Sequence, residues 1–238
     1  MKTKPYHHYL IPLAILATLL FLGSCSKKET QQTNQPPLAR EYPNEWMYNQ
    51  RAYPHNYINK KAINEAVAQS RSILGARAPQ ENDWELVGPL NTGGRITDIA
   101  LSPNNDDVFY AATAVGGVFK TTNGGAAWEP IFDDIAKASI GDIALAPSNP
   151  QILYVGTGEA NGSGTSGAFF GDGIYRSEDA GASFTNIGLD GTDHIGRIVI
   201  DPTDPDRVFV AATGKLYGKN EDRGIYRTTN GGNSWDRV

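Results

Sequence analysis

Short apolar runs separated by polar turns fill most of the chain after residue 90. The runs are about five residues long and rich in Ile, Val, Phe and Tyr, and they alternate with stretches of Pro, Gly, Asn and Asp. Apolar runs of this length, bounded by such turn formers, are strand signals. The pattern therefore predicts β-structure over residues 81–238.

The same order of runs occurs three times, which identifies an internal repeat. The first runs of the three copies are residues 96–103, 140–147 and 195–202; the second runs are 108–112, 152–156 and 208–212; the third runs are 117–120, 173–176 and 224–227. Four antiparallel strands every ~40–50 residues are typical of a β-propeller blade. We predict an all-β fold, a β-propeller of about three four-stranded blades at 90–135, 136–190 and 191–238.

A turn with four fixed positions follows the third run of each copy, and we call it the Asp/Asn turn. It reads Ser/Thr-x-Asp/Asn-x-Gly-x-x-aromatic, and the copies start 56 and then 51 residues apart. The hydroxyl and the Asp or Asn side chain can bond nearby backbone N–H groups, while Gly supplies a positive φ. We expect the aromatic ring to bury itself under the turn. The residues are Thr121, Asn123, Gly125, Trp128; Ser177, Asp179, Gly181, Phe184; and Thr228, Asn230, Gly232, Trp235.

Propellers usually have four to eight blades, and three leave open sheet edges. We therefore expect the chain to be the N-terminal part of a longer propeller, or a truncated product. Residues 83–89 resemble a strand that follows an Asp/Asn turn. One hypothesis is that this strand pairs with the last blade.

The leader, residues 40–80, differs from the repeats. Its residues 58–74 carry apolar side chains at helical spacing, and Gly75 can end a helix. We expect Ile63, Ala66, Val67, Ser70, Ile73 and Leu74 to form the apolar face. The helix is expected to pack against the side of the propeller, and a stalk is the alternative.

The first residues resemble a bacterial lipoprotein signal. Lys2 and Lys4 precede an apolar stretch that ends in Leu-Gly-Ser-Cys, and Cys25 is the single cysteine. We expect a signal peptide at 1–24, lipidation of Cys25 and a flexible tether at 25–39. A plain secretory signal is the alternative. The expected location is the bacterial cell envelope, at the outer membrane or cell surface rather than the cytoplasmic membrane. The formal net charge of −5 argues against nucleic-acid partners.

Residues 84–96 and 112–125 resemble the bacterial Asp-box propellers, a group that includes neuraminidase-repeat (BNR) glycosyl hydrolases and sortilin-like propellers. This resemblance covers about residues 42–238 and is specific for the fold rather than for a reaction. It implies a module that binds glycan or polypeptide ligands at the loops of one propeller face. The alternatives are a glycoside hydrolase whose catalytic residues lie outside this chain, and a structural module for envelope assembly.

Residues that two enzyme families need are absent from this chain. A likeness to xyloglucanases implies a catalytic Asp at the position of Ala114, and alanine cannot act in hydrolysis. The Arg-Ile-Pro motif of sialidases is replaced by Arg95-Ile96-Thr97. The remaining candidate carboxylates are Asp98, Asp142, Glu159, Asp172, Asp193 and Glu221. We expect Asp98 and Asp142, which share a repeat position, to be structural.

A long loop after the second run of the middle copy is the candidate ligand site. Long loops in compact domains are often functional, and aromatic side chains can stack on sugars or seat peptide side chains. The candidate residues are Glu159, Asn161, Phe169, Phe170 and Asp172.

No cofactor or metal is expected. Residues 162–167 match Gly-x-Gly-x-x-Gly but open no helix, so they do not indicate a nucleotide site. The acidic turn 201–206 could suggest calcium, but the aligned turns carry Asn or Ser. Outside the signal only His55 and His194 remain, too few for a zinc cluster. We expect His194 to be structural.

Overall fold

The structure is a computed structural model that describes residues 52–55, 57–75, 93–161, 169–216 and 221–238. All of these belong to one unit, residues 42–238. The predicted signal peptide, Cys25, the tether and the strand expected at 83–89 lie outside the described residues, as does the Gly-x-Gly-x-x-Gly stretch at 162–167.

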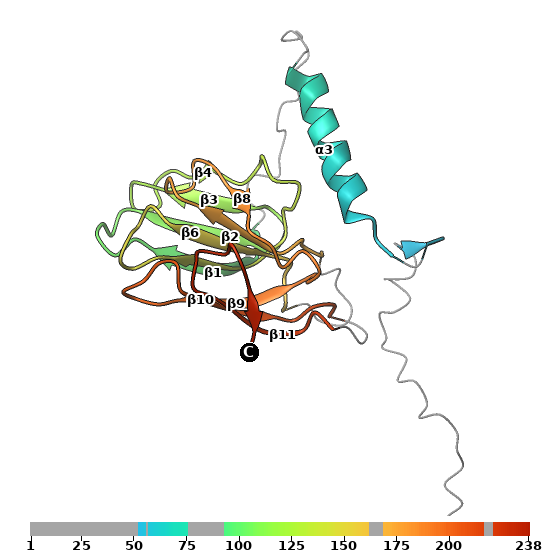
Figure 1. The fold of residues 1–238 in the computed structure, drawn as a ribbon. Coiled ribbons are helices and arrows are strands. Elements are labelled where there is room, and N and C mark those ends of the chain that lie inside the picture. The colour runs from blue at the N-terminus through green and yellow to red at the C-terminus, as the bar shows by residue number, and fades with distance from the viewer. Residues whose placement is uncertain (1–51, 56, 76–92, 162–168, 217–220) are drawn as a thin grey trace, which may run out of the picture. The chain divides into compact units, whose positions relative to one another are not determined.

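Within these ranges, the strands form three antiparallel four-stranded sheets, each paired in chain order. Blade 1 comprises β1 (Ile96–Leu101), β2 (Phe109–Thr113), β3 (Val118–Thr121) and β4 (Glu129–Pro130). Blade 2 comprises β5 (Ile140–Leu145), β6 (Leu153–Thr157), β7 (Ile174–Ser177) and β8 (Thr185–Asn186). Blade 3 comprises β9 (Ile195–Ile200), β10 (Val208–Ala212), β11 (Gly224–Thr228) and β12 (Asp236–Arg237). The predicted propeller blades are confirmed (Figure 1). The described strands close no ring.

The strand register corrects one alignment made from the sequence. Phe109, Leu153 and Val208 occupy the same position, because they pair with Leu101, Leu145 and Ile200. The alignment of Val208 with Val108 and Ile152 was therefore wrong by one residue. Relative to the strand pairing, the apolar run of the third copy starts one residue later than the runs of the other two copies. Equivalent positions are therefore defined by the pairing between strands and not by the first apolar residue of each run.

Each Asp/Asn turn closes on itself through the same hydrogen bonds. In blade 2, Ser177 Oγ accepts from Gly181 N at 2.8 Å and donates to Asp179 Oδ1 at 2.7 Å. Asp179 Oδ1 also accepts from Ser183 N at 2.8 Å. The other two copies repeat these bonds from the Thr hydroxyl and the Asn carbonyl. The Gly at the fifth position has φ of 90–95° in all three, which favours glycine.

The aromatic side chain of each turn contacts the preceding blade where one exists. Phe184 meets Phe132 edge to face at 4.8 Å, and Trp235 Nε1 donates to Ile187 O at 2.8 Å. Trp128, in the first blade, packs on Phe109 of its own blade and stays 43 % exposed. In blades 1 and 2 the ring lies against the glycine of its own turn, because an ideal Cβ on Gly125 or Gly181 would lie 3.8 or 3.7 Å from it. A neighbouring blade covers the ring further where it contacts one, and Phe184 and Trp235 are half-buried.

The core lies between the blades rather than within them. One cluster joins blades 1 and 2: Ala100, Tyr110, Ala112, Val118, Phe132, Ile140, Ile143, Leu153, Val155 and Tyr175. A second joins blades 2 and 3: Ala146, Ile152, Tyr154, Ile174, Ile195, Ile198, Ile200, Val208, Val210 and Ala212. Burying one such large side chain contributes about 1.5–3 kcal/mol, so the blades stabilise one another.

The predicted leader helix is α3 (Lys60–Gly75). Asn59 caps it, since its Oδ1 accepts from Ala62 N at 3.0 Å. The half-buried face toward the blades is Lys60, Asn64, Val67 and Arg71. Of the predicted apolar stripe, Val67 lies on this face and Ile63 lines a pocket beside it. Ile73 is 51 % exposed. Polar bonds hold the helix: Lys60 pairs with Asp193 at 2.6 Å, and Arg71 donates to the carbonyls of Asp133 and Asp134. Among the described helices, none is long and apolar enough to cross a membrane.

Three charged residues connect the innermost strands of the three blades. Asp98, Asp142 and Arg197 share one repeat position on β1, β5 and β9. Arg197 lies 3.3 Å from Asp142 and 3.7 Å from Asp98. Asp142 Oδ2 also accepts from Ile198 N at 2.6 Å. Burial, and then the hydrogen bond and negative charge of Asp98, raise the pKa of Asp142 to about 7, against the effects of Ile198 N–H and Arg197.

The hydroxyl of the central turn should be important for stability. We expect Ser177→Ala to lower the free energy of unfolding by about 1–3 kcal/mol, because the substitution leaves the buried Gly181 N–H without its acceptor. The matched control is Ser183→Ala, which removes an exposed hydroxyl bonded to Asp179 Oδ2. Urea unfolding followed by circular dichroism measures both. Equal effects of the two substitutions would contradict the role of the turn.

The inner-strand cluster should make stability depend on pH. The folded-state pKa of Asp142 is raised to about 7, so the folded chain binds more protons than the unfolded chain between about pH 4 and pH 7. The contribution of this group is full below that window and is lost as pH rises through it, at up to about 1.4 kcal/mol per pH unit. Asp142→Asn keeps the acceptor for Ile198 N and removes the titration. We expect the variant to gain stability over the wild type from pH 4 to pH 7.5 in urea unfolding. Parallel curves would show that Asp142 does not titrate there.

Candidate ligand-binding site

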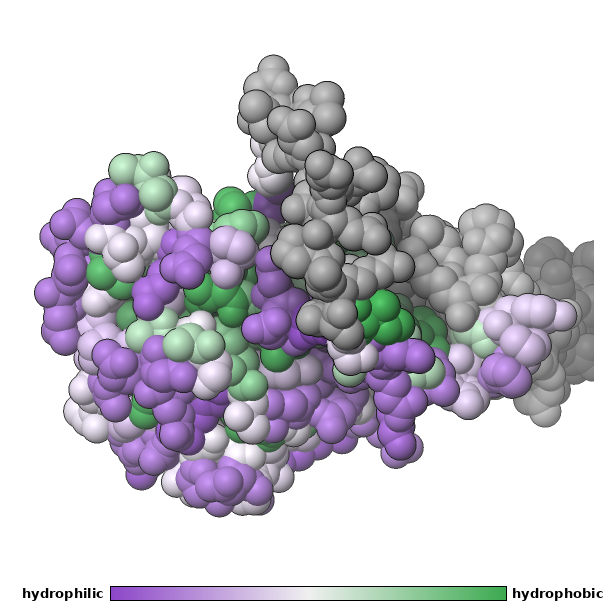
Figure 2. Space-filling view, turned by 90° about the horizontal axis from the view of Figure 1, so that it is seen from above, coloured by the Kyte–Doolittle hydropathy of each residue, from purple (hydrophilic) through white to green (hydrophobic). Residues whose placement is uncertain are grey.

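A pocket of about 210 Å³ lies where the β4–β5 connection meets the loop between β6 and β7. Its lining is mostly apolar: Ile63, Val115, Ala136, Lys137, Ala138, Ser139, Phe169 and Phe170. Figure 2 shows one face of the molecule, on which apolar side chains reach the surface among hydrophilic ones. Two of the five loop residues singled out in the sequence, Phe169 and Phe170, line this pocket.

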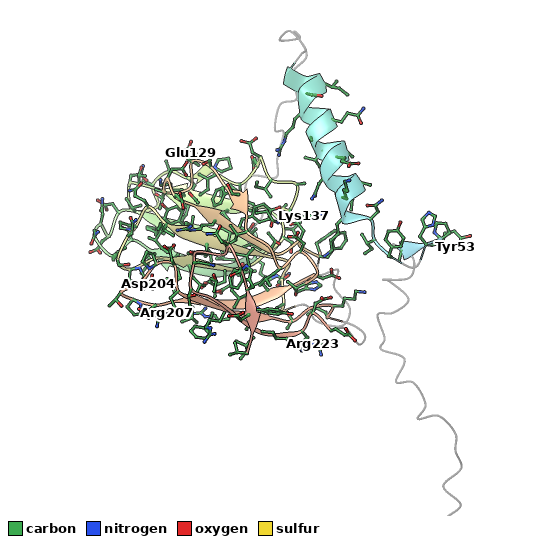
Figure 3. The ribbon with its side chains drawn as sticks, viewed as in Figure 1. Tyr53, Glu129, Lys137, Asp204, Arg207 and Arg223 are labelled. Atoms are coloured by element: carbon green, nitrogen blue, oxygen red, sulfur yellow. The ribbon has the colours of Figure 1, made fainter. Side chains whose placement is uncertain are left out.

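Lys137 is the charged residue among the described residues that line the pocket (Figure 3). Lys137 is only 3 % exposed, and its ammonium has no hydrogen-bond partner in the described part of the chain. The nitrogen lies 5.2 Å from the ring centroid of Phe170, a cation–π distance. Burial lowers the pKa of Lys137, whereas the charges of Asp172 and Asp193 raise it and that of Lys60 lowers it. The pocket thus holds an ammonium with unused donors.

The connection that carries Lys137 is fixed at both ends. Phe132, 1 % exposed, packs edge to face on Tyr175 and Phe184. Farther along, Ala138 O accepts from Gly116 N and Gly117 N at 2.9 and 2.7 Å. Lys137 therefore stands between two anchors, so its position does not depend on a flexible loop.

The loop between β6 and β7 also starts and ends on buried backbone. Gly158 has φ of 80°, and a Cβ there would lie 1.9 Å from Asp193 O; a Cβ on Gly171 would lie 2.3 Å from the carbonyl carbon of Thr157. Both positions therefore need glycine. Gly171 N donates to Asp193 O at 2.7 Å. Close backbone packing thus holds the base of the loop, and Phe169 and Phe170 come just before Gly171.

Glu159, a candidate ligand residue, is engaged within the fold. It is 1 % exposed, and both of its oxygens accept from the guanidinium of Arg95, Oε2 at 2.6 Å from Nη2. Its N–H donates to Ser139 Oγ at 3.1 Å. A buried, bidentately paired carboxylate of this kind joins blades 1 and 2 and offers no free oxygen edge to a ligand.

Asp172 is likewise occupied by the fold. Its carboxylate accepts from Tyr175 OH at 3.1 Å and from Asn64 Nδ2 at 3.0 Å. Asn161 is exposed and does not line the pocket. The structure brings together Phe169 and Phe170 from the predicted set in the pocket, whereas Glu159 and Asp172 are held by contacts within the fold.

The other candidate residues are spread over the blades. Asp193 pairs with Lys60, Glu221 is exposed, and Ala114 is buried. His194 is buried with Nδ1 2.9 Å from Gly214 O, and burial lowers its pKa. In the turn 201–206 the acidic side chains cap backbone N–H groups or pair with Arg176. No three His, Cys, Asp or Glu residues of the described ranges lie together as a metal site.

The sequence did not identify Lys137 or the helix residue Ile63 as residues that line the pocket. Lys137 stands in the run Ala-Lys-Ala-Ser, which carries no motif. Lys137 is buried because Phe132 and Ala138 fix the β4–β5 connection against the blades. No signal in the sequence alone separates it from an exposed lysine.

The chain matches no protein-family model and no curated protein sequence. Solved structures with similar folds include an ancestral GH74 enzyme, 21 % identical with a TM-score of 0.49, aligned over 67 % of this chain and 20 % of its own. A GH74 enzyme of Niastella koreensis is 24 % identical with a TM-score of 0.45, over 58 % of this chain and 20 % of its own. YCF48 from Cyanidioschyzon merolae is 18 % identical with a TM-score of 0.42, over 63 % of this chain and 41 % of its own. The chain spans about a fifth of the length of the two GH74 enzymes it resembles.

Proposed function

We propose that this chain is a ligand-binding propeller module whose pocket at Lys137, Phe169 and Phe170 takes a carboxylate-bearing polypeptide segment. The observation that carries the proposal is the buried ammonium without a hydrogen-bond partner among the described residues, set in an apolar pocket. An ammonium has three donors, and leaving them unused in an apolar surrounding is costly. A ligand carboxylate supplies the missing acceptor.

The lining favours a polypeptide over a glycan. Of the described lining residues other than Lys137, only Ser139 carries a polar side chain, and its Oγ already accepts from Glu159 N. A sugar carries a hydroxyl on most carbons, and each buried hydroxyl needs a partner. An aliphatic or aromatic peptide side chain next to a carboxylate matches both the apolar wall and the ammonium.

Glycan binding and glycoside hydrolysis are the alternatives. Hydrolysis ordinarily needs two carboxylates on opposite sides of the bond, at least about 5 Å apart. The described carboxylates at the two ends of the β6–β7 loop are Glu159, held by Arg95, and Asp172, held by Tyr175 and Asn64. This chain's described residues thus favour binding, and a catalytic pair would have to come from elsewhere.

The N-terminal residues support a second proposal, that the module is a lipid-anchored protein of the bacterial envelope. Support comes from the basic start, the apolar stretch and the Leu-Gly-Ser-Cys site at Cys25. An acylated Cys25 followed by a polar linker at 25–39 would tether the blades to a membrane and hold them away from its surface.

The peptide proposal predicts a charge-dependent affinity. A pool of random tetrapeptides with free C-termini should be retained by the full chain about tenfold more strongly than the same pool with amidated C-termini, because a charge-assisted hydrogen bond contributes about 1.5–3 kcal/mol. Lys137→Met should abolish the difference while leaving stability equal or higher, since it removes a buried charge. Phe169→Ala should weaken retention of both pools.

Tyr53→Ala is the matched control, because Tyr53 is 81 % exposed and does not line the pocket (Figure 3). Retention is measured by mass spectrometry of the bound pool. If neutral xyloglucan oligosaccharides bind in a Phe169-dependent way and neither peptide pool does, the glycan alternative replaces the proposal. Binding of free-acid peptides that is unchanged in Lys137→Met would contradict the site.

The anchor proposal predicts that Cys25→Ala moves the chain from the membrane to the soluble fraction of a bacterial host. The lipidated wild type should carry added acyl mass on its first residue, and the variant should not. Fractionation and intact-mass analysis test this. Membrane retention of the variant would show that another segment holds the chain.

A further inference from the structure

Another pocket, of about 230 Å³, lies between blades 1 and 2 at the opposite end of β2 from the pocket of Lys137. Val108, just before β2, lines this pocket, whereas Val115, just after β2, lines the other. A strand of this length spans about 17 Å. The two pockets are therefore separate places on the molecule.

Lys120 is the charged residue among the described residues that line this pocket. It is half-buried; its Nζ donates to Ala180 O at 2.9 Å and lies 5.5 Å from the ring centroid of Tyr110. Glu129 stands opposite it on β4 (Figure 3), but Glu129 is exposed, and Lys120 forms no ion pair with any carboxylate of the described ranges. An ammonium has three donors, so Lys120 can donate further hydrogen bonds.

The equivalent residue of blade 2 has the carboxylates that Lys120 lacks. Arg176 occupies the same position on β7, because both residues have the same register with the second strand of their blades. It also lies over a tyrosine ring, at 5.6 Å. Arg176 pairs with two carboxylates, Glu178 of its own blade at 2.9 Å and Asp206 of blade 3 at 2.6 Å.

Neutral residues stand at the places of both carboxylates around Lys120. Thr122 follows Lys120 at the spacing at which Glu178 follows its arginine. Gln151 matches Asp206, because the backbone carbonyl of each accepts from the same residue of the Asp/Asn turn in its own blade. Thr122 and Gln151 both line the pocket. The pocket therefore opens where blades 2 and 3 hold their carboxylates.

The rest of the lining combines hydroxyl and amide groups with apolar ones. Ser102, Thr122 and Gln151 carry neutral polar side chains, which both donate and accept hydrogen bonds. The hydroxyls of a sugar need such partners when they are buried. Val108 and Leu145 offer apolar contact to the C–H groups of a sugar ring. A saccharide that carries a carboxylate matches the ammonium, the neutral polar groups and the apolar wall together.

We infer that the pocket at Lys120, Thr122 and Gln151 is a binding site for an acidic saccharide, of which a hexuronate is the simplest kind. The ligand carboxylate takes the place of the two carboxylates that pair with Arg176. The site shares no residue with the pocket of Lys137, so either assignment can fail without the other.

The sharpest test supplies the missing carboxylate from within the chain. Gln151→Asp gives blade 2 the residue that blade 3 has at this position, and we expect the new carboxylate to pair with Lys120 and exclude the ligand. Affinity of the full chain for trigalacturonic acid, measured by saturation-transfer NMR titration, should fall at least about tenfold, without loss of stability in urea unfolding. Lys120→Gln should weaken binding as much, and Lys120→Arg should preserve it.

Two exposed residues of α3 provide matched controls. Gln69→Asp and Lys61→Gln change the net charge of the chain by the same amounts and line neither pocket, so they should bind the acid as the wild type does. The methyl ester of the trisaccharide keeps the ring hydroxyls without the charge, and it should bind the wild type at least about tenfold more weakly than the acid.

An acetylated and amidated Gly-Glu-Gly peptide tests the class of ligand, since it offers a carboxylate without sugar hydroxyls. We expect it to bind more weakly than trigalacturonic acid. Tighter binding of the peptide through Lys120 overturns the saccharide assignment. Equal binding of acid and ester, a wild type that binds neither, or binding unchanged in both Lys120→Gln and Gln151→Asp overturns the site.

Discussion

The packing of one blade's face against the next is the interaction on which the rest of this structure depends. A four-stranded sheet with strands of two to six residues has no interior of its own, so its apolar side chains must be covered by another sheet. Both core clusters lie between blades, and blade 2, with a neighbour on each side, contains the most completely buried strand, β6. Stability is therefore a property of neighbouring pairs, as in other repeat proteins.

The Asp/Asn turn links local chemistry to this packing. Its internal hydrogen bonds satisfy backbone groups that a tight connection otherwise leaves open, and its glycine lets the backbone approach the neighbouring blade closely. The carbonyl oxygen of Ala180 in this turn accepts hydrogen bonds from two side chains of the preceding blade, Tyr110 and Lys120. One turn thus completes its own blade and positions the adjacent one.

Much of the fold could be predicted from the sequence because the same pattern of strands and turns occurs three times. Strand order, turn chemistry and blade spacing follow from periodic apolar runs and from residue types that one local geometry demands. The exposure of Trp128 could not be predicted, since the burial of this ring depends on whether another blade packs against it. The face of α3 that contacts the blades was predicted only in part, since Val67 and Ile63 of the predicted stripe lie toward the blades. Lys60, Asn64 and Arg71 contact the blades through polar bonds that apolar periodicity does not reveal. Within the candidate site, the aromatic pair was visible in the sequence, but Lys137 was not, because burial of a lone lysine depends on tertiary contacts.

The pocket follows from the same interface. Its wall combines the β4–β5 connection, which leads from blade 1 into blade 2, with the loop that leaves β6 of blade 2. The carboxylates that surround it are already satisfied: Glu159 by Arg95, Asp193 by Lys60, and Asp172 by Tyr175 and Asn64. Lys137 differs from these residues because its ammonium has no hydrogen-bond partner among the described residues. Among the described buried charged residues, Lys137 is the one whose charged group has no such partner, and this supports the proposal that a ligand carboxylate binds beside the two phenylalanines.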